Sequence, residues 1–334
     1  MHLRALLAIL SLLTLFATPT TTKEIPPGLR DLYNKIRSSG SCTGDDLLKG
    51  GFFDQNDGSL PLWSYCQRHT SSSAIYLKGP GDLLANMDVD CDGIQSVNAT
   101  GLRTGNRNRA ANVNRNGTNP NPSDTRCTGF PNTQPQTSFR STLQSEGYGI
   151  PDLNPTIHPD IVLGNTGSQP CSRTFDPRTA DIQPLSIVAV VCNNALIYGI
   201  WGDVNGDDGL PLVGEASLAL ATACFGEGVN GGNGWDGADV LYLAFKGDGA
   251  APGPQGAKWN ARDYAEFEGS ILDLGDGLVE GLIGEVEADE EGGGCASGIG
   301  DNSGNGTYGG GRGTGVCGFN GSSPVSRRRG GGDQ

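Results

Sequence analysis

Residues 185–201 read LSIVAVVCNNALIYGIW, two apolar runs that meet at Asn193 and Asn194. Asparagine tolerates the positive φ angles of a tight two-residue turn, so this stretch predicts a β-hairpin. Short apolar segments punctuated by Gly, Asn, Asp and Pro, a pattern typical of β structure, fill the chain between Cys42 and Cys91. Further strands are predicted over 161–163 and 240–245. The sequence therefore indicates a mostly β domain, either a small barrel or a β-sandwich.

A few helices are expected at the periphery of this β structure. Residues 27–37 place four apolar side chains on one face at helical spacing, namely Leu29, Leu32, Tyr33 and Ile36. Two more helices are predicted over 139–148 and 260–282. The segment 215–224, EASLALATAC, is compatible with a helix that begins as a strand.

The two ends of the chain differ in composition from its centre. Residues 1–22 combine a basic start, a short apolar run and small residues, which is typical of a secretory signal peptide, and residues 23–40 are expected to pack as an N-terminal brace. From 284 to 334 the chain is acidic and then rich in Gly and Ser, so we expect a low-complexity, disordered tail. One globular domain, 41–283, remains, and an Asn- and Arg-rich surface insertion interrupts it at 98–126.

Composition and cysteine usage favour a secreted, extracellular protein. The 334 residues include nine cysteines, an odd number, and none of them forms a C-x-x-C pair, so disulfides are favoured over zinc. Four glycosylation sequons agree with that compartment, at Asn98, Asn116, Asn305 and Asn320. The formal net charge of -14 disfavours nucleic acid and anionic membranes as partners, and no run after the signal peptide is long enough to span a bilayer. We expect a monomer with a neutral or basic partner.

The hairpin leads directly into WGDVNGDDGLPLVGEAS, residues 201–217, which places Asp203 and Glu215 at the ends of two predicted strands. Glycoside hydrolysis needs two such carboxyl groups, about 6.5–9.5 Å apart in inverting enzymes and about 5–5.5 Å apart in retaining ones. Spacing in the sequence leaves that distance open. Glu215 has apolar neighbours, which favour a raised pKa, whereas Asp203 lies beside a polar loop and is expected to ionise easily.

Calcium binding is the competing hypothesis for two acidic stretches. Asp203-x-Asn205-x-Asp207 and Asp88-x-Asp90-x-Asp92 both begin like an EF-hand loop. The first has Asp208 where that loop needs Gly and Gly214 where it needs Glu, and the second has Ala99 at the Glu position. Turn chemistry is an alternative by which Asn205, Asp207 and Asp208 would need no function, and it is the favoured interpretation for Asp208. We therefore expect neither a metal nor a cofactor.

Several stretches together resemble the fungal endo-chitosanases of glycoside hydrolase family 75, over most of residues 41–282. They are LLANMDVDCDG (83–93), IHPDIVLGN (157–165), PLSIVAVVCNNALIYGIWGDVNGDDG (184–209), VGEASLALATACF (213–225) and DVLYLAFKG (239–247). The resemblance implies Asp203 and Glu215 as the catalytic pair, with Asp207 as a substitute for Asp203. It also implies an inverting, endo-acting hydrolase of β-1,4-linked glucosamine polymers and a barrel of the double-psi type.

Chitosan is a polycation at mildly acidic pH, which suits an acidic cleft. The resemblance implies substrate-binding roles for Asp88, Asp90, Asp92, Trp201, Asn205 and Asp207, although Trp201 is equally compatible with a place in the core. The basic insertion, with Arg103, Arg107, Arg109, Arg115 and Arg126, and the Gly-rich tail depart from the family. Two alternatives stay open: hydrolysis of another β-1,4 glycan such as chitin or cellulose, and a non-catalytic secreted protein that binds carbohydrate or calcium.

Overall fold

The computed structural model describes residues 23–55, 60–69, 72–94, 125–127, 136–167, 173–206 and 209–292. These ranges belong to one compact unit. The predicted signal peptide, the four sequons, nearly all of the basic insertion, Asp207 and Asp208, and the Gly-rich tail lie outside the described residues.

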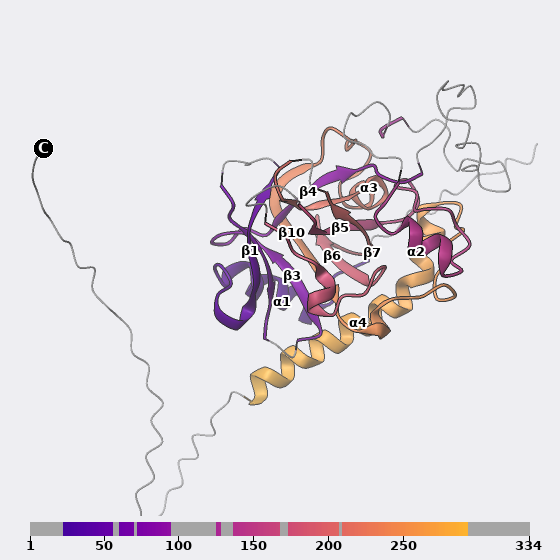
Figure 1. Ribbon diagram of the computed structural model, residues 1–334. Helices are drawn as coiled ribbons and strands as arrows, with labels where there is room; N and C mark the ends of the chain where they lie inside the picture. The colour runs from indigo at the N-terminus through magenta and orange to yellow at the C-terminus, as the bar shows by residue number, and fades with distance from the viewer. Residues whose placement is uncertain are drawn as a thin grey trace, which may run out of the picture. The chain divides into compact units, whose positions relative to one another are not determined.

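Six strands form a closed ring (Figure 1). Each strand pairs with the next in the order β4 (Ala85–Asp90), β9 (Glu215–Ser217), β5 (Asp160–Asn165), β7 (Ala195–Asn205), β6 (Ile187–Cys192) and β10 (Trp235–Phe245). The ring closes because β10 also pairs with β4, where Val240 lies opposite Ala85. The closed ring confirms the predicted barrel and not the β-sandwich, which would need two separate packed sheets. The double-psi connectivity stays a prediction.

The remaining strands extend the sheet from β10. In spatial order they are β3 (Ala74–Lys78), β2 (Trp63–Gln67), β1 (Leu47–Asp54) and β8 (Leu212–Val213). The first three meander with antiparallel pairing, as the turn signals between Cys42 and Cys91 predict. The short β8 then runs parallel to β1 and delivers the chain to Gly214 and Glu215. This extension therefore positions the start of β9, which carries the second predicted acid, Glu215.

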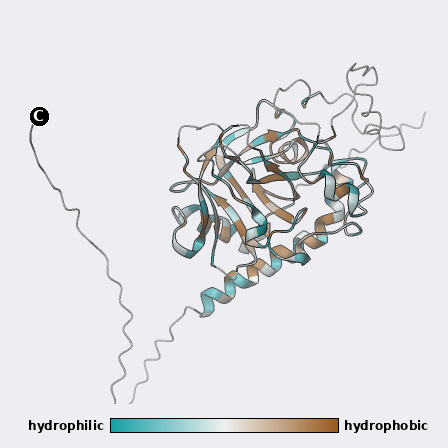
Figure 2. Ribbon diagram, in the orientation of Figure 1, coloured by the Kyte–Doolittle hydropathy of each residue, from teal (hydrophilic) through white to brown (hydrophobic). Residues whose placement is uncertain are grey.

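The hairpin of β6 and β7 forms as predicted. Asn193 and Asn194 have φ angles of 42° and 64°, and Cys192 pairs with Ala195 on either side of the turn. Every residue of β6 is buried, and the ring strands are mostly hydrophobic in Figure 2. Helix α4 (Tyr264–Gly292) packs against this hairpin so closely that a side chain at Gly275 would lie 2.6 Å from the Tyr198 ring.

The shorter helices also lie outside the ring. Helix α1 (Pro27–Ser38) buries Leu29, Leu32 and Ile36 and confirms the predicted apolar face, and α2 (Arg140–Ser145) is shorter than its predicted span. Helix α3 (Leu218–Phe225) begins directly after β9, capped by the Ser217 side chain, so segment 215–224 does begin as a strand. Three 3₁₀ turns cover Gly44–Asp46, Pro177–Ala180 and Asp248–Ala250. Among the described residues, no helix combines the length and apolar character needed to cross a bilayer.

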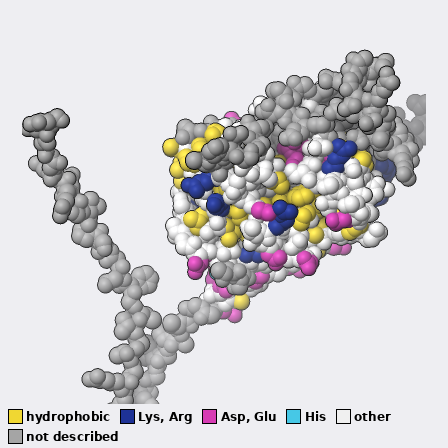
Figure 3. All heavy atoms as spheres, in the orientation of Figure 1, with side chains coloured by type: hydrophobic (Ala, Val, Ile, Leu, Met, Phe, Trp, Pro, Cys, Tyr) yellow, Lys and Arg dark blue, Asp and Glu magenta, His cyan; other side chains and the backbone are white. Residues whose placement is uncertain are grey.

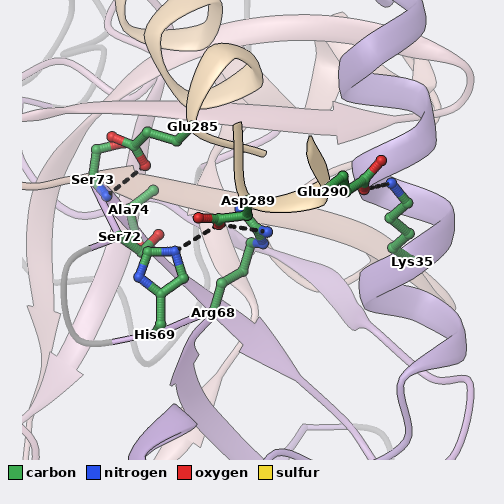
Figure 4. A network of polar contacts seen from close by, with 9 residues as sticks. All are labelled: Lys35, Arg68, His69, Ser72, Ser73, Ala74, Glu285, Asp289 and Glu290. Atoms are coloured by element: carbon green, nitrogen blue, oxygen red, sulfur yellow. Dashed lines mark hydrogen bonds and ion pairs between the residues drawn. The ribbon is translucent and has the colours of Figure 1, made fainter. Parts of the chain in front are cut away.

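Helix α4 corrects one predicted boundary. It begins where Asp263 accepts a hydrogen bond from the Glu266 N–H at 2.9 Å, and it continues past position 283, where we expected the disordered tail to start. The acidic residues of its last turns contact other elements rather than solvent alone (Figure 4): Glu285 accepts from the Ser73 N–H, and Asp289 pairs with Arg68 and His69. Figure 3 shows Asp and Glu side chains along the margin where α4 runs.

Three disulfides join the described cysteines. They connect Cys42 with Cys66, Cys91 with Cys127, and Cys192 with Cys224. The second one holds the two ends of the basic insertion together directly after β4, with a Cα–Cα distance of 5.5 Å. Cys171, Cys295 and Cys317 lie outside the described residues.

Candidate active site

Neighbouring strands of the ring carry the two predicted catalytic acids in one row. Glu215 on β9 pairs with Val162 on β5, and Val162 pairs in turn with Asp203 on β7. On its other side Glu215 pairs with Asp88 on β4. Because paired residues of adjacent strands point to the same face of a sheet, these three carboxyl groups share one face. Asp203 and Glu215 are separated by the width of a single intervening strand.

Local backbone geometry fixes the position of Glu215. Gly214 has a φ of 92°, and a side chain there would lie 2.2 Å from the Asn86 Oδ1 atom, so only glycine fits before this acid. Asn205, at the end of β7, donates a hydrogen bond from Nδ2 to the Glu215 Oε2 atom at 2.8 Å. The predicted site residue Asn205 therefore lies beside the acid and orients its carboxylate.

Asp203 is almost completely buried, with 4% of its surface exposed. Its Oδ1 atom accepts hydrogen bonds from the Ser138 N–H at 2.9 Å, the Ser138 hydroxyl at 2.5 Å and the Val204 N–H at 2.7 Å. Burial and the nearby Asp90 raise the pKa of Asp203 to about 7, against the opposing effect of these bonds. The expectation that Asp203 ionises easily is therefore wrong, because burial and the charge of Asp90 outweigh these donors.

The acids of β4 adjoin the same row. Burial raises the pKa of Asp88 to about 7, although Asn86 donates to its Oδ2 atom at 2.7 Å. Burial and the charge of Glu215 raise the pKa of Asp90 to about 7 as well. Asp90 accepts from the Asp92 N–H at 2.9 Å, so Asp92 begins a turn just beyond the strand.

The two stretches that begin like EF-hand loops, the Asp88 site and the Asp203 site, both start within strands. Asp88 and Asp90 lie within β4 rather than in a loop, which removes the ring-like wrapping of an EF-hand. At the second site Asp203 and Asn205 likewise belong to β7, and Asp207 lies outside the described residues. Within the described ranges, no group of three or more His, Cys, Asp or Glu side chains is arranged to hold a metal ion.

Asp160 is a site residue that the sequence did not reveal. It opens β5, is 3% exposed, and packs so closely on Gly202 that a side chain at Gly202 would lie 2.4 Å from the Asp160 Cβ atom. Burial first, and then the charges of Asp90, Asp203 and Asp152, raise the pKa of Asp160 well above its usual range. The one available signal was an acid at the start of an apolar strand, in the stretch IHPDIVLGN.

Trp201 belongs to the core. Its ring has no exposed surface and packs edge-on against Phe139 at 4.8 Å between centroids, so it presents no face to a sugar ring. The indole N–H donates to the Leu163 and Asp203 carbonyl oxygens at 2.9 and 2.8 Å. Trp201 thus holds the backbone at Asp203, and the core alternative left open by the sequence is the correct one.

Comparisons with known proteins identify the family of this chain. The family described as fungal chitosanase of glycosyl hydrolase group 75 matches residues 87–281, which span all the acids above. An endo-chitosanase of Aspergillus oryzae is 35% identical over 283 residues, 84% of this chain and 99% of that protein. An endo-chitosanase of Aspergillus fumigatus is 36% identical over 266 residues, 79% of this chain and 94% of that protein. The endo-chitosanase C of Aspergillus oryzae is 29% identical over 200 residues, 60% of this chain and 39% of that protein.

Proposed function

This chain belongs to the fungal chitosanases of glycosyl hydrolase group 75, and from that premise we propose that it is secreted and cleaves chitosan within the polymer by an inverting mechanism. Asp203 and Glu215 are the two catalytic carboxyl groups in this proposal. The observation that carries it is the shared row across three strands, in which Val162 alone separates the two acids.

The strand register supports inversion. Adjacent strands are about 4.7–4.9 Å apart, so two positions that flank one intervening strand lie roughly 9–10 Å apart at their backbones. Side chains of this length reach toward one another from there, within about 6.5–9.5 Å for inverting enzymes and well beyond the roughly 5–5.5 Å of retaining ones. The gap admits the water molecule that attacks the anomeric carbon opposite the leaving group.

The environments of the two acids suggest their roles. With a pKa of about 7, Asp203 holds a proton at the mildly acidic pH where chitosan is soluble and cationic, so it protonates the leaving glycosidic oxygen. Glu215, oriented by the Asn205 amide, acts as the base that activates water. Asp88 and Asp90 flank the row, and because they too hold protons at that pH they bind the glucosamine units by hydrogen bonds, with Asp92 next to them beyond β4.

The test is an assay of reducing ends released from chitosan, chitin and cellulose by the wild-type protein and by Glu215→Gln. We expect release from chitosan alone, with the activity of the variant lowered about 10²–10⁴-fold. NMR of the first product should show inverted anomeric configuration. No activity in either protein would favour the non-catalytic binding protein, and equal activity in both would remove Glu215 from the catalytic pair. Sequencing the N-terminus of protein from the culture medium tests secretion, with a start near Lys23 expected.

A further inference from the structure

A two-residue segment outside the ring joins two buried carboxyl groups. Thr137 donates to Asp152 from its N–H at 3.1 Å and from its hydroxyl at 2.6 Å. Ser138, the next residue, donates to the Asp203 Oδ1 atom through the same two kinds of group. Thr137 and Ser138 thus each donate one backbone and one hydroxyl hydrogen bond to a different acid. The peptide bond between them links Asp203 to Asp152.

The Asp152 end of this segment is firmly held. Asp152 and Thr137 are 2% and 4% exposed, and Asp152 also accepts from the Leu153 N–H at 2.9 Å. Leu153 packs over the backbone beside Asp203, where a side chain at Gly202 would lie 2.7 Å from the Leu153 Cδ1 atom. The Leu153 carbonyl accepts from the Ile94 N–H at 2.8 Å. The backbone that carries Ser138 is therefore held in place beside Asp203 by these contacts.

The hydrogen bonds at Asp203 distinguish its two oxygens. Oδ1 accepts three of them, two from Ser138 and one from the Val204 N–H. An oxygen that already faces three donors cannot also carry the acidic proton without placing hydrogen against hydrogen. When Asp203 is protonated, its proton therefore sits on Oδ2.

We propose that Ser138 is a positioning residue for the hydrolytic reaction, which fixes the Asp203 carboxyl group and directs its proton to Oδ2, the oxygen that protonates the leaving group. This inference rests on the proposed function for its catalytic meaning. Ser138 donates two hydrogen bonds to Asp203, and in this proposal its effect reaches the reaction through that carboxyl group.

Removing the Ser138 hydroxyl should change titration as well as rate. The hydroxyl stabilises the Asp203 carboxylate against burial and against the charge of Asp90, so its loss raises the pKa of Asp203 further. A general acid must be protonated to act, so the alkaline limb of the kcat profile moves to higher pH. We expect a shift of about one pH unit in Ser138→Ala, a value typical of one lost charge-assisted hydrogen bond.

The experiment compares three variants with the wild type across pH. Ser138→Ala should lower kcat about tenfold with little change in KM, because proton placement is lost while the sugar contacts persist. Ser138→Thr keeps the hydroxyl and should restore both the rate and the profile. Ser145→Ala, on the exposed side of α2, is the control and should match the wild type. An upward shift of the acidic limb instead would make Asp203 the base and would overturn the proposal.

A second readout does not depend on catalysis. Carboxyl carbon NMR follows the titration of Asp203, with its signal identified by its loss in Asp203→Asn. The midpoint should rise in Ser138→Ala and return in Ser138→Thr. Unchanged midpoints and an unchanged pH profile would overturn the inference. Failure of the wild type to cleave chitosan would reject the proposed function alone, because the NMR titration would still decide whether Ser138 controls Asp203.

Discussion

Two acid-rich regions of this molecule behave in opposite ways. At the end of α4, Asp289 pairs with Arg68 and His69 from the β2–β3 connection, and Glu290 pairs with Lys35 of α1. In the ring, burial raises the pKa of Asp90, Asp160 and Asp203, and the charge of Asp90 raises the pKa of the other two further. We refer to Glu285, Asp289 and Glu290 as the helix acids, and to Asp88, Asp90, Asp160 and Asp203 as the ring acids.

The difference separates structural acids from chemical ones. A carboxylate opposite a cation at the surface joins two elements and contributes little energy. A carboxyl buried beside others retains its proton to higher pH, which is the property that acid catalysis near neutral pH requires. In the proposed function, similar residue types thus join two elements in one region and transfer protons in the other, and their surroundings decide which.

The sharpest test of this contrast makes the same substitution in both regions. Asp203→Asn should lower the rate of chitosan cleavage about 10²–10⁴-fold, because the amide has no proton of suitable acidity to transfer. Asp289→Asn should leave the rate unchanged. Reducing-end assays on both variants, with circular dichroism as the check on folding, measure the effect. A comparable loss of activity in the two variants would erase the proposed distinction.

The ring acids should also make the protein less stable as pH rises. Below about pH 4 they are protonated in both the folded and unfolded states; between about pH 4 and 7 the unfolded chain releases these protons while Asp88, Asp90 and Asp203 retain theirs. The free energy of unfolding should therefore fall steadily over that window, because each unit by which folding raises a carboxyl pKa costs about 1.4 kcal/mol once the unfolded chain has ionised. Urea unfolding at several pH values measures it.

One buried imidazole opposes this trend, and one variant isolates the cause. Burial lowers the pKa of His158 to about 4, so its contribution to stability is lost as pH falls from about 6.5 to 4. Three carboxyl groups outweigh that single group.

Asp160→Asn should flatten the fall in stability with pH, gaining more stability at pH 7 than at pH 5 because the amide cannot ionise. Stability that is level or increasing from pH 5 to 8 in the wild type would count against the ring-acid account.

One glycine in each acidic region tests the same contrast through the backbone. Gly214→Ala should destabilise the fold by about 1–3 kcal/mol and displace Glu215, because Gly214 has a positive φ and the added Cβ atom would lie 2.2 Å from the Asn86 Oδ1 atom. Gly284→Ala, in an open position on α4, should stabilise it by about 0.5–1 kcal/mol. Thermal unfolding together with the chitosan assay reads both changes. A tolerated alanine at 214 would show that the turn before Glu215 is not constrained.

Local sequence patterns predicted the frame of the site well. The Asn193–Asn194 turn and the apolar runs beside it follow from backbone preference and periodicity, which act over a few residues. Asp203 and Glu215 were identifiable because each ends or begins an apolar run next to a loop. Glu215 begins β9 as expected, and the pairing through Val162 explains why two acids distant in the chain share a face.

What escaped prediction depends on contacts between distant segments. Asp160 was overlooked because an acid at the start of a strand is normally solvated, and only Gly202 and its neighbours bury it. Ser138 belongs to no motif, and its proposed role arises because the preceding Thr137 is bonded to Asp152 while Ser138 itself donates to Asp203. The end of α4 was misread because its partners, Arg68 and His69, are 221 and 220 positions away from Asp289.

The smallest expected effect concerns the helix acids. Arg68→Gln should lower the free energy of unfolding by no more than about 1 kcal/mol, since Asp289 is 45% exposed and surface ion pairs of this kind are weak. Added salt screens the same pair, so 1 M NaCl should reduce the difference between variant and wild type. Hydrogen exchange should locate the change in the last turns of α4, leaving β7 and β9 protected. Faster exchange in those two ring strands would mean that the helix end also supports the catalytic row, and the two acidic regions would no longer be independent.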